Sequence, residues 1–548
     1  MAPHAASDFA HPAPPPPPSV RRLLLDTHFP GKRWPVGLRA AISLFVPALL
    51  TLNLGHEDGM LLVAGGFCVV LYGDGHAYRA RAGVLGWAVL LLTGLAFLGS
   101  LTGHVVYGLV DATGGAQWPL LITAVLSSLV GMVMVYGSTA LRLPPPGPFF
   151  FVMTFGAVTL TGRTGTTPLE VGGWILLGAL WAWLVSMSGV LVDRFAPERI
   201  AVASAEKAVE AYEANPMDGA ARNRAAGAMQ AAWHALHDAH AVRGGRILDG
   251  PRRQLAEKAL QLRGRMYVAV AAGAAGSRDD DIADAAQADT ARPHTNRPPL
   301  ARPSWWYRIR RSAGFRSHAG LTATRVGVAA LAAGVLSVAV GLDRPDWAVI
   351  TAVLVLQRGP DRTAGSVRAL HRFLGSLAGV LAFALIHLFV DSPLALLVVL
   401  AALTFTAELT IVRNYAIAVS ATTPLALLMG GALDLPLGDV VMARILEIVV
   451  GVGCALAALW LVLRRGSAEV LKLTESRVHR AVDELAEARV AGADSDEVLE
   501  RRRDLQFELH GNQLAAEQAA RDMPEWTRAN WPTHVSTQQL GYATLARR

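Results

Sequence analysis

Residues 82–103 read AGVLGWAVLLLTGLAFLGSLTG, and no Asp, Glu, Lys or Arg interrupts the chain between Arg81 and Asp111. A helix of about 20 apolar residues crosses the ~30 Å hydrocarbon core of a bilayer. Comparable charge-free stretches lie between Arg39 and Glu57, between Glu170 and Asp193, and between Arg325 and Asp343. These runs are apolar on every face, whereas the strands of a membrane barrel alternate polar and apolar residues. The sequence therefore predicts an all-α membrane protein.

Working outward from this stretch, we find two hydrophobic blocks with the same layout of six segments each. The predicted membrane segments are 38–56, 59–73, 82–103, 118–140, 147–162 and 168–192, then 323–342, 346–357, 373–390, 393–412, 415–433 and 441–463. Because six is an even number, both blocks must have the same orientation in the membrane. We therefore expect a parallel repeat of two six-helix transmembrane units, about 12 helices in all, with each unit followed by a cytoplasmic helical domain.

Basic residues fall in every second loop of this scheme. Arg142, for example, lies between the fourth and fifth segments, and Arg413 lies between the tenth and eleventh. Lys and Arg in short loops are retained on the cytoplasmic side. The pattern predicts a multi-pass protein of the plasma (inner) membrane with both termini and the central region in the cytoplasm.

The remaining regions are polar. We expect a disordered Pro-rich N-terminus at 1–37, a first membrane unit at 38–192, a helical domain at 193–276, a linker at 277–318, a second membrane unit at 319–465 and a C-terminal helical domain at 466–548. Three helices are predicted in the central domain and two in the C-terminal one, at about 467–491 and 495–522. Their apolar stripes favour packing as a helical bundle over ligand binding.

Composition excludes several functional classes. The net charge is +7, but the basic residues are distributed as topology determinants and helix surface, so a nucleic-acid partner is not expected. The two cysteines, Cys68 and Cys454, lie inside apolar segments and fit neither a disulfide framework nor a metal site. No ATP-binding loop of the Gly-Lys-Ser/Thr type is present. We expect no catalytic residues, no metal and no cofactor, and hence no enzyme.

The second block resembles the fusaric acid resistance and aromatic acid exporter family. The resemblance is carried by DWAVITA at 346–352, RGPD at 358–361, Arg368 and Arg372 before GSLAG at 375–379, and RILE at 444–447 with Gly451. It implies efflux of small aromatic or related organic acids, coupled to an ion gradient. Two alternatives stay open: an anion channel like the plant aluminium-activated malate channels, and a membrane scaffold that binds proteins through its cytoplasmic helices. A homodimer is expected by analogy only.

Two pairs of short or interrupted segments stand at matching places, the second with the eighth and the fifth with the eleventh. Such pairs are the best sequence pointer to a transport site. For substrate binding we single out Arg39 and Arg325 at matching helix entrances, Arg368 and Arg372 beside the short eighth segment, and Trp347 and Thr351 within the family-like pattern. The competing interpretation is that arginines at helix ends only snorkel and fix topology.

Ionisable side chains inside membrane helices are costly and therefore suggest function. Glu408, Glu447 and Arg444 meet this criterion and are our candidates for proton coupling. Arg444 and Glu447 are three residues apart, so mutual neutralisation is the alternative. Phe149 and Phe150 could stack on an aromatic substrate or simply face lipid.

Overall fold

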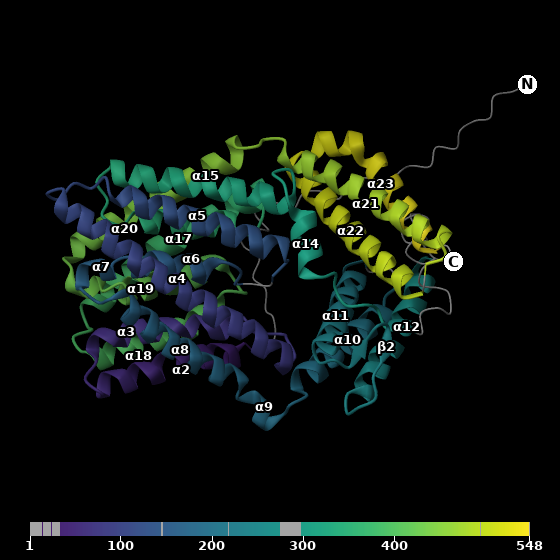
Figure 1. The fold of residues 1–548 in the computed structure, drawn as a ribbon, viewed down its shortest axis with the longest axis horizontal. Helices are drawn as coiled ribbons and strands as arrows, with labels where there is room; N and C mark the ends of the chain where they lie inside the picture. Colours follow the sequence, from purple (N-terminus) through teal and green to yellow (C-terminus); the bar gives the residue numbers. More distant parts are fainter. Residues whose placement is uncertain are drawn as a thin grey trace, which may run out of the picture.

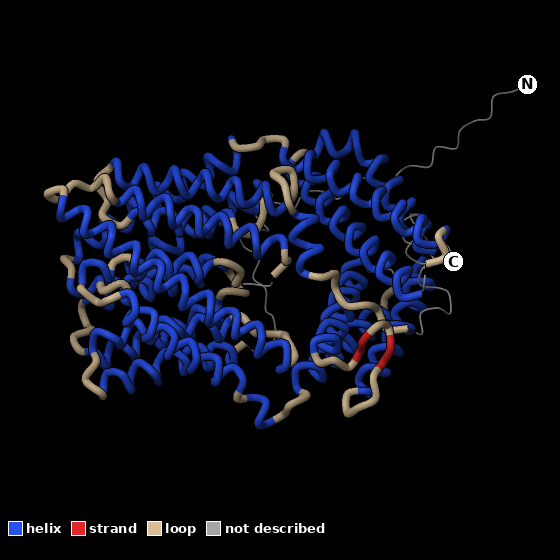
Figure 2. The backbone as a smooth tube through the Cα atoms, viewed as in Figure 1, coloured by secondary structure: helices blue, strands red, loops and turns tan. Residues whose placement is uncertain are grey.

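The computed structural model describes residues 33–143, 146–216, 219–274, 297–493 and 495–546, together with Pro14 and Leu24. Most of the predicted Pro-rich N-terminus and residues 277–296 of the predicted linker lie outside the described residues. Helix dominates the described part of the chain (Figure 2). Its two strands, β1 (Val242–Arg243) and β2 (Arg246–Ile247), form a small antiparallel hairpin.

Eight helices of the described residues are long and apolar enough to cross a membrane. They are α2 (Trp34–Asn53), α4 (Tyr78–Ala112), α5 (Leu120–Ala140), α8 (Pro168–Met187) continued by α9 (Gly189–Val192), α15 (His318–Ala339), α17 (Arg362–His387), α18 (Pro393–Thr410) and α20 (Leu437–Leu461). Large apolar side chains such as Trp87, Leu90 and Leu381 are exposed on the outside of this bundle, as expected for contact with lipid. The prediction of an all-α membrane protein is confirmed.

Four further apolar segments are too short to span a bilayer alone. They are α3 (Glu57–Gly65) continued by the 3-10 helix η1 (Gly66–Leu71), α6 (Phe149–Val158) followed by α7 (Thr161–Thr164), α16 (Pro345–Leu356), and α19 (Tyr415–Met429) followed by η3 (Ala432–Asp434). They occupy the places of the predicted second, fifth, eighth and eleventh segments. Every residue of α16 is buried. The long helices therefore surround the short ones and shield them from lipid.

Helix pairs at matching places make matching contacts. Helix α2 packs against α18, and α15 packs against α5. Helix α4 packs against α6 and α8, while α17 packs against α19 and α20. In both halves the approach to the fifth or eleventh segment uses two glycines four residues apart, Gly99 with Gly103 and Gly375 with Gly379. Small residues at this spacing let membrane helices approach backbone to backbone.

The approach of α4 to the fifth segment leaves no room for a side chain. A Cβ atom added to Gly103 would lie 1.9 Å from the carbonyl oxygen of Thr159, and one added to Gly375 would lie 2.4 Å from that of Ala416. Real Cβ atoms do not come this close to other heavy atoms. Both glycines are therefore steric requirements of the helix packing.

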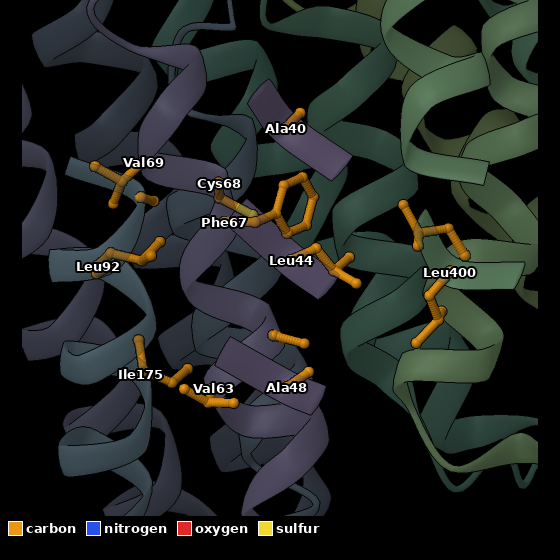
Figure 3. Close-up of a cluster of buried hydrophobic side chains, with 14 of the residues drawn as sticks. Ala40, Leu44, Ala48, Val63, Phe67, Cys68, Val69, Leu92, Ile175 and Leu400 are labelled. Carbon is orange, nitrogen blue, oxygen red and sulfur yellow. The ribbon is translucent and has the colours of Figure 1, made fainter. Parts of the chain in front are cut away.

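A buried apolar cluster joins the two halves of the bundle. Figure 3 shows Leu44 of α2, Val63 of α3, Phe67 of η1 and Leu92 of α4 in this cluster, together with Leu400 of α18. Burial of each large apolar side chain contributes about 1.5–3 kcal/mol. In a bilayer, close packing of these shapes replaces much of that driving force, since lipid is as apolar as leucine.

Two polar helical regions lie at one end of the bundle (Figure 1). The first contains α10 (Ala196–Glu213), α11 (Gly219–Asp238) and α12 (Arg253–Ala274), and the second contains α21 (Gly466–Val490), α22 (Ser495–Asp522) and α23 (Pro524–Ala546). Below, this end is called the domain end and the opposite end the far end. Helix α23 was not predicted from the sequence, and α14 (Trp305–Ser312) falls inside the predicted linker.

Several helix bounds differ from the predicted ones because buried arginines were taken as loop residues. Helix α17 begins at Arg362 and not near 373, so Arg368 and Arg372 lie within it. Its first turn is capped by the Asp361 side chain, which accepts a hydrogen bond from the Ala364 amide at 2.9 Å. Helix α15 likewise begins at His318, so Arg325 lies two turns inside the helix. A charge therefore did not mark the membrane boundary at these places.

Candidate functional site

The short helices surround a cavity of about 460 Å³ in the middle of the bundle. Its walls come from α3, η1, α6, α16 and α19, with further residues from α17 and α18. Asp58, Arg163 and Leu435 line it where it reaches the surface. These three residues adjoin α3, α7 and η3, and Figure 1 places α3 and α7 at the end remote from the helical domains. The cavity therefore opens at the far end.

Towards the domain end the cavity is closed by aromatic and charged contacts. The Tyr72 hydroxyl donates a hydrogen bond to the Gly147 carbonyl oxygen at 3.0 Å, and the Tyr72 ring stacks on Phe151 with centroids 4.8 Å apart. Beyond them, Asp74 accepts a hydrogen bond from Arg39 at 3.0 Å and lies 3.9 Å from Arg81. The substrate candidate Arg39 therefore belongs to this closure and does not line the cavity.

Arg372 is the cation placed deepest in the cavity wall. Its residue surface is 5% exposed, and its Nε atom has no hydrogen-bond partner among the described residues. It reaches the cavity from the third turn of α17. An unpaired guanidinium edge in an apolar wall favours a carboxylate as its partner, because a buried charge without a counter-charge is costly.

The remaining cavity wall is mostly apolar and aromatic. Phe149 and Phe150 of α6 line it, with ring centroids 4.6 Å apart, and Trp347 of α16 lines the same space. Thr404 of α18 adds a hydroxyl that has no partner among the described residues. Thr404 was missed in the sequence, where a threonine within an apolar segment carried no distinguishing signal.

Glu408 is the most buried of the three carboxylates that line the cavity, the others being Asp58 and Asp434. Its side chain is 14% exposed, and its nearest ion-pair partner among the described residues is Arg33, at 3.9 Å. This pair is looser than a directly hydrogen-bonded salt bridge. Glu408 and Arg372 therefore place one acidic and one basic group on the same cavity.

Trp347 is held from behind by a buried ionic network. The Arg444 guanidinium lies 4.2 Å from the Trp347 ring centroid and donates a hydrogen bond to Glu447 at 3.1 Å. Arg344 donates two hydrogen bonds to Asp346, at 3.1 and 2.9 Å, one residue before Trp347. Arg444 and Glu447 do not line the cavity. Their pairing matches the neutralisation that the sequence left open as an alternative to proton coupling.

The other candidates for substrate binding lie away from the cavity. Arg325 is 1% exposed, and its guanidinium donates to the carbonyl oxygens of Val462, Pro360 and Leu463 at 3.1, 2.8 and 3.2 Å. Arg368 donates to the Val355 carbonyl oxygen at 3.1 Å, an acceptor near the end of α16. Both side chains tie helix ends together, which explains why arginine is placed there.

Thr351 is fully buried between α16 and α20. A Cβ atom added to Gly451 would lie 2.7 Å from the Thr351 Cβ, so the two helices touch at this point. Among the nine candidates from the sequence, Trp347, Arg372 and Glu408 line the cavity. Within the described part of the chain, no group of three or more His, Cys, Asp or Glu side chains is arranged to hold a metal ion.

The helices that contribute Trp347, Arg372 and Glu408 all fall within residues 329–458, and this stretch matches the sequence profile described as fusaric acid resistance protein-like. This stretch of the chain is therefore similar to the fusaric acid resistance protein-like family. The fusaric acid resistance protein-like region runs from α15 to α20 and so includes one half of the bundle. This agrees with the resemblance seen in the sequence and identifies a helical, multi-pass membrane protein of the transport type.

A comparison with a whole protein extends the similarity to the N-terminal half of the membrane bundle. Over 561 aligned positions the chain is 25% identical to the uncharacterized membrane protein YvaC of Bacillus subtilis (strain 168), which covers 94% of this chain and 85% of the relative. The similarity therefore includes both membrane halves and the helical domains. No solved structure matches the chain.

Proposed function

We propose that the protein is a secondary transporter that exports small aromatic monocarboxylates and is driven by a proton gradient. The observation that supports this most directly is Arg372, buried in the wall of an apolar cavity with an unpartnered Nε atom. Its guanidinium would bind the carboxylate of the substrate through charge-assisted hydrogen bonds.

The cavity favours one negative charge and an apolar body. Arg372 is the buried cation of the wall and Glu408 accompanies it there, whereas Arg163 lies at the exposed rim. A second carboxylate deep in the cavity would therefore be repelled by Glu408. Phe149, Phe150 and Trp347 supply ring faces for stacking. A volume of about 460 Å³ suits a compound with one or two rings.

Glu408 is the proposed site of proton coupling. It lies on the same cavity as Arg372 and is only weakly paired with Arg33. A proton that reaches Glu408 from the far end would neutralise the carboxylate. Release of that proton at the domain end would restore the negative charge of Glu408. Binding of an anionic substrate in the same cavity depends on the charge of Glu408. This dependence couples the flux of protons to the flux of substrate.

The doubled packing supports two six-helix units with the substrate path between them. The matching glycine pairs and the matching contacts of α2 with α18 and of α15 with α5 are what a parallel repeat requires. Arg142 and Arg358 adjoin α21 and α22 in a second cavity at the domain end. The domain end is therefore proposed to be cytoplasmic, in the inner membrane, by the rule that basic loops stay inside.

Uptake of radiolabelled benzoate into inverted vesicles that contain the purified protein tests this proposal. We expect accumulation against the benzoate gradient when an inside-acidic proton gradient is imposed, and loss of accumulation in Arg372→Gln. Arg79→Gln, an exposed arginine at the start of α4 that does not line the cavity, is the control for loss of a positive charge and should transport normally. Flux that only runs downhill would identify an anion channel and would refute proton-driven export.

A further inference from the structure

A second cavity, of about 540 Å³, lies at the domain end between the membrane bundle and the C-terminal helices. The bundle contributes the loop before α6, the start of α15 and the turn after α16, and the soluble region contributes α21 and α22. Pro148 lines this cavity, whereas the next residue, Phe149, lines the central one. The two cavities are therefore neighbours across the first turn of α6.

The walls of the second cavity carry an excess of positive charge. Arg142, Arg311, Arg358 and Arg477 line it, and Glu508 is the carboxylate in the same wall. Glu508 is already engaged, because it accepts a hydrogen bond from the Tyr307 hydroxyl at 3.2 Å and lies 3.6 Å from the Arg311 Nε atom. Arg311 also pairs with Glu484 at 3.3 Å, so Glu508 is the carboxylate in the cavity wall that faces Arg142, Arg358 and Arg477.

Arg142, Arg358 and Arg477 make no short ion pair within the described part of the chain, although Glu508 acts electrostatically on Arg142 and Arg477. Each comes from a different element, namely the loop after α5, the turn after α16 and helix α21. Burial lowers the pKa of Arg142 to about 10, an effect that Glu508 opposes and that neighbouring arginines, including Arg477, reinforce. The cavity wall therefore carries more positive than negative charge.

Apolar side chains complete the cavity and fix one of the cations. The Arg142 guanidinium lies 4.0 Å from the Phe507 ring centroid, which holds it in place by a cation–π contact. Leu473 and Leu514 line the space beside Phe507. A ligand that suits these walls has charged groups at its edge and an apolar body.

We propose that this cavity binds a soluble organic dianion, such as an aromatic dicarboxylate, at a site separate from the central cavity. Three arginines on different elements, with Glu508 as the carboxylate beside them, match two carboxylates better than one. Among the wall elements, α14, α21 and α22 lie outside the candidate membrane spans, so the ligand would come from the aqueous phase. Binding would also bridge the C-terminal helices to the bundle.

Equilibrium dialysis of labelled phthalate against the full chain in detergent at pH 7.5 tests the site. The experiment uses the Arg372→Gln protein, so that binding in the central cavity does not contribute and the outcome is independent of the transport proposal. We expect saturable binding of phthalate that is at least tenfold tighter than binding of benzoate. Replacing Arg477 by Gln in that protein should weaken phthalate binding at least tenfold.

Arg480→Gln is the matched control, because Arg480 lies one turn further along α21, is exposed and does not line the cavity. It should leave phthalate binding unchanged. Equal loss in Arg480→Gln and Arg477→Gln, or absence of saturable binding, would overturn the proposal. Because Glu508 acts electrostatically on Arg477, the Tm of Arg477→Gln without ligand is measured alongside binding, and an unchanged Tm would show that the variant keeps its fold.

If Arg477→Gln lowers the Tm instead, Arg358→Gln replaces it as the test variant, and retention of phthalate binding there would overturn the proposal.

The membrane is the competing source of anionic groups. Loss of phthalate binding in bilayers of phosphatidylglycerol, with retention in phosphatidylcholine, would assign the cavity to a lipid headgroup and refute a soluble ligand.

Discussion

Replacing Arg372 and Arg325 by Gln, one at a time, should separate a binding side chain from a structural one. Both arginines belong to the same family-like pattern in the sequence, and both are at most 5% exposed. Arg325 donates to three carbonyl oxygens, whereas the Nε atom of Arg372 is unpartnered among the described residues and its side chain lines the cavity. The two variants should therefore fail in different assays.

The expected magnitudes follow from these contacts. A hydrogen bond from a charged group contributes about 1.5–3 kcal/mol, so loss of the three bonds of Arg325 should cost about 4 kcal/mol or more. At about 2 °C per kcal/mol for a large domain, the Tm of Arg325→Gln should fall by about 8 °C. Arg372→Gln loses at most the contact of its guanidinium with Tyr415, so its Tm should fall much less. Loss of one charge-assisted carboxylate pair, about 2–3 kcal/mol, should weaken benzoate binding about 30- to 150-fold.

Thermal unfolding and benzoate binding of both variants in detergent are the measurements. Arg325→Lys serves as a control for charge, because lysine keeps the charge but cannot span three acceptors in the fixed geometry of a guanidinium. It should also be destabilised. An unchanged Tm in Arg325→Gln together with lost binding would show that Arg325 contacts the substrate and would refute the assignment made here.

Three further outcomes are expected. Glu408→Gln should abolish the dependence of benzoate uptake on the proton gradient while leaving downhill exchange, and a retained dependence in vesicles would remove Glu408 from the coupling mechanism. Gly103→Val should lower the Tm and the yield of folded protein, because its Cβ would lie 1.9 Å from the Thr159 carbonyl oxygen, whereas Gly108→Val on the same helix meets no atom within 4 Å and should behave like the parent. His534, fully buried in α23, has a pKa lowered to about 4 by burial. The unfolded state takes up that proton first, so stability is complete above pH 6.5 and declines by about 1.4 kcal/mol per pH unit as the pH falls towards 4. Urea unfolding between pH 7 and 5 should show this slope, and His534→Gln should flatten it.

The membrane helices were readable from the sequence because apolar composition is a local property. Segments at 82–103 and 168–192 correspond closely to α4 and α8, and the short segments fell at the places of α16 and α19. Helix α23 was missed because Pro524 at its first position and Pro532 inside it read as breaks. Its formation depends on burial against α21 and α22, which a local pattern does not encode.

The site was only partly readable, for a physical reason. Arg325 and Arg372 have similar neighbours in sequence, and what separates them is the direction of the side chain relative to distant carbonyl groups such as those of Val462 and Leu463. These two carbonyl groups lie more than one hundred positions after Arg325 in the sequence. A sequence pattern can identify charged residues inside membrane helices. Only tertiary contacts determine whether the hydrogen-bond donors of such a residue are occupied by the protein or available to a ligand.

The opening of the central cavity at the far end has a practical consequence for inhibition. Arg372 and Trp347 line a space that reaches the surface beside Asp58 and Leu435, while Tyr72 closes the other end. A bulky aromatic acid that cannot cross a lipid bilayer would still reach these side chains from that surface. In the proposed transport mechanism, a compound of this kind bound to Arg372 would hold the two halves of the bundle apart. It would therefore block export without passing through the membrane.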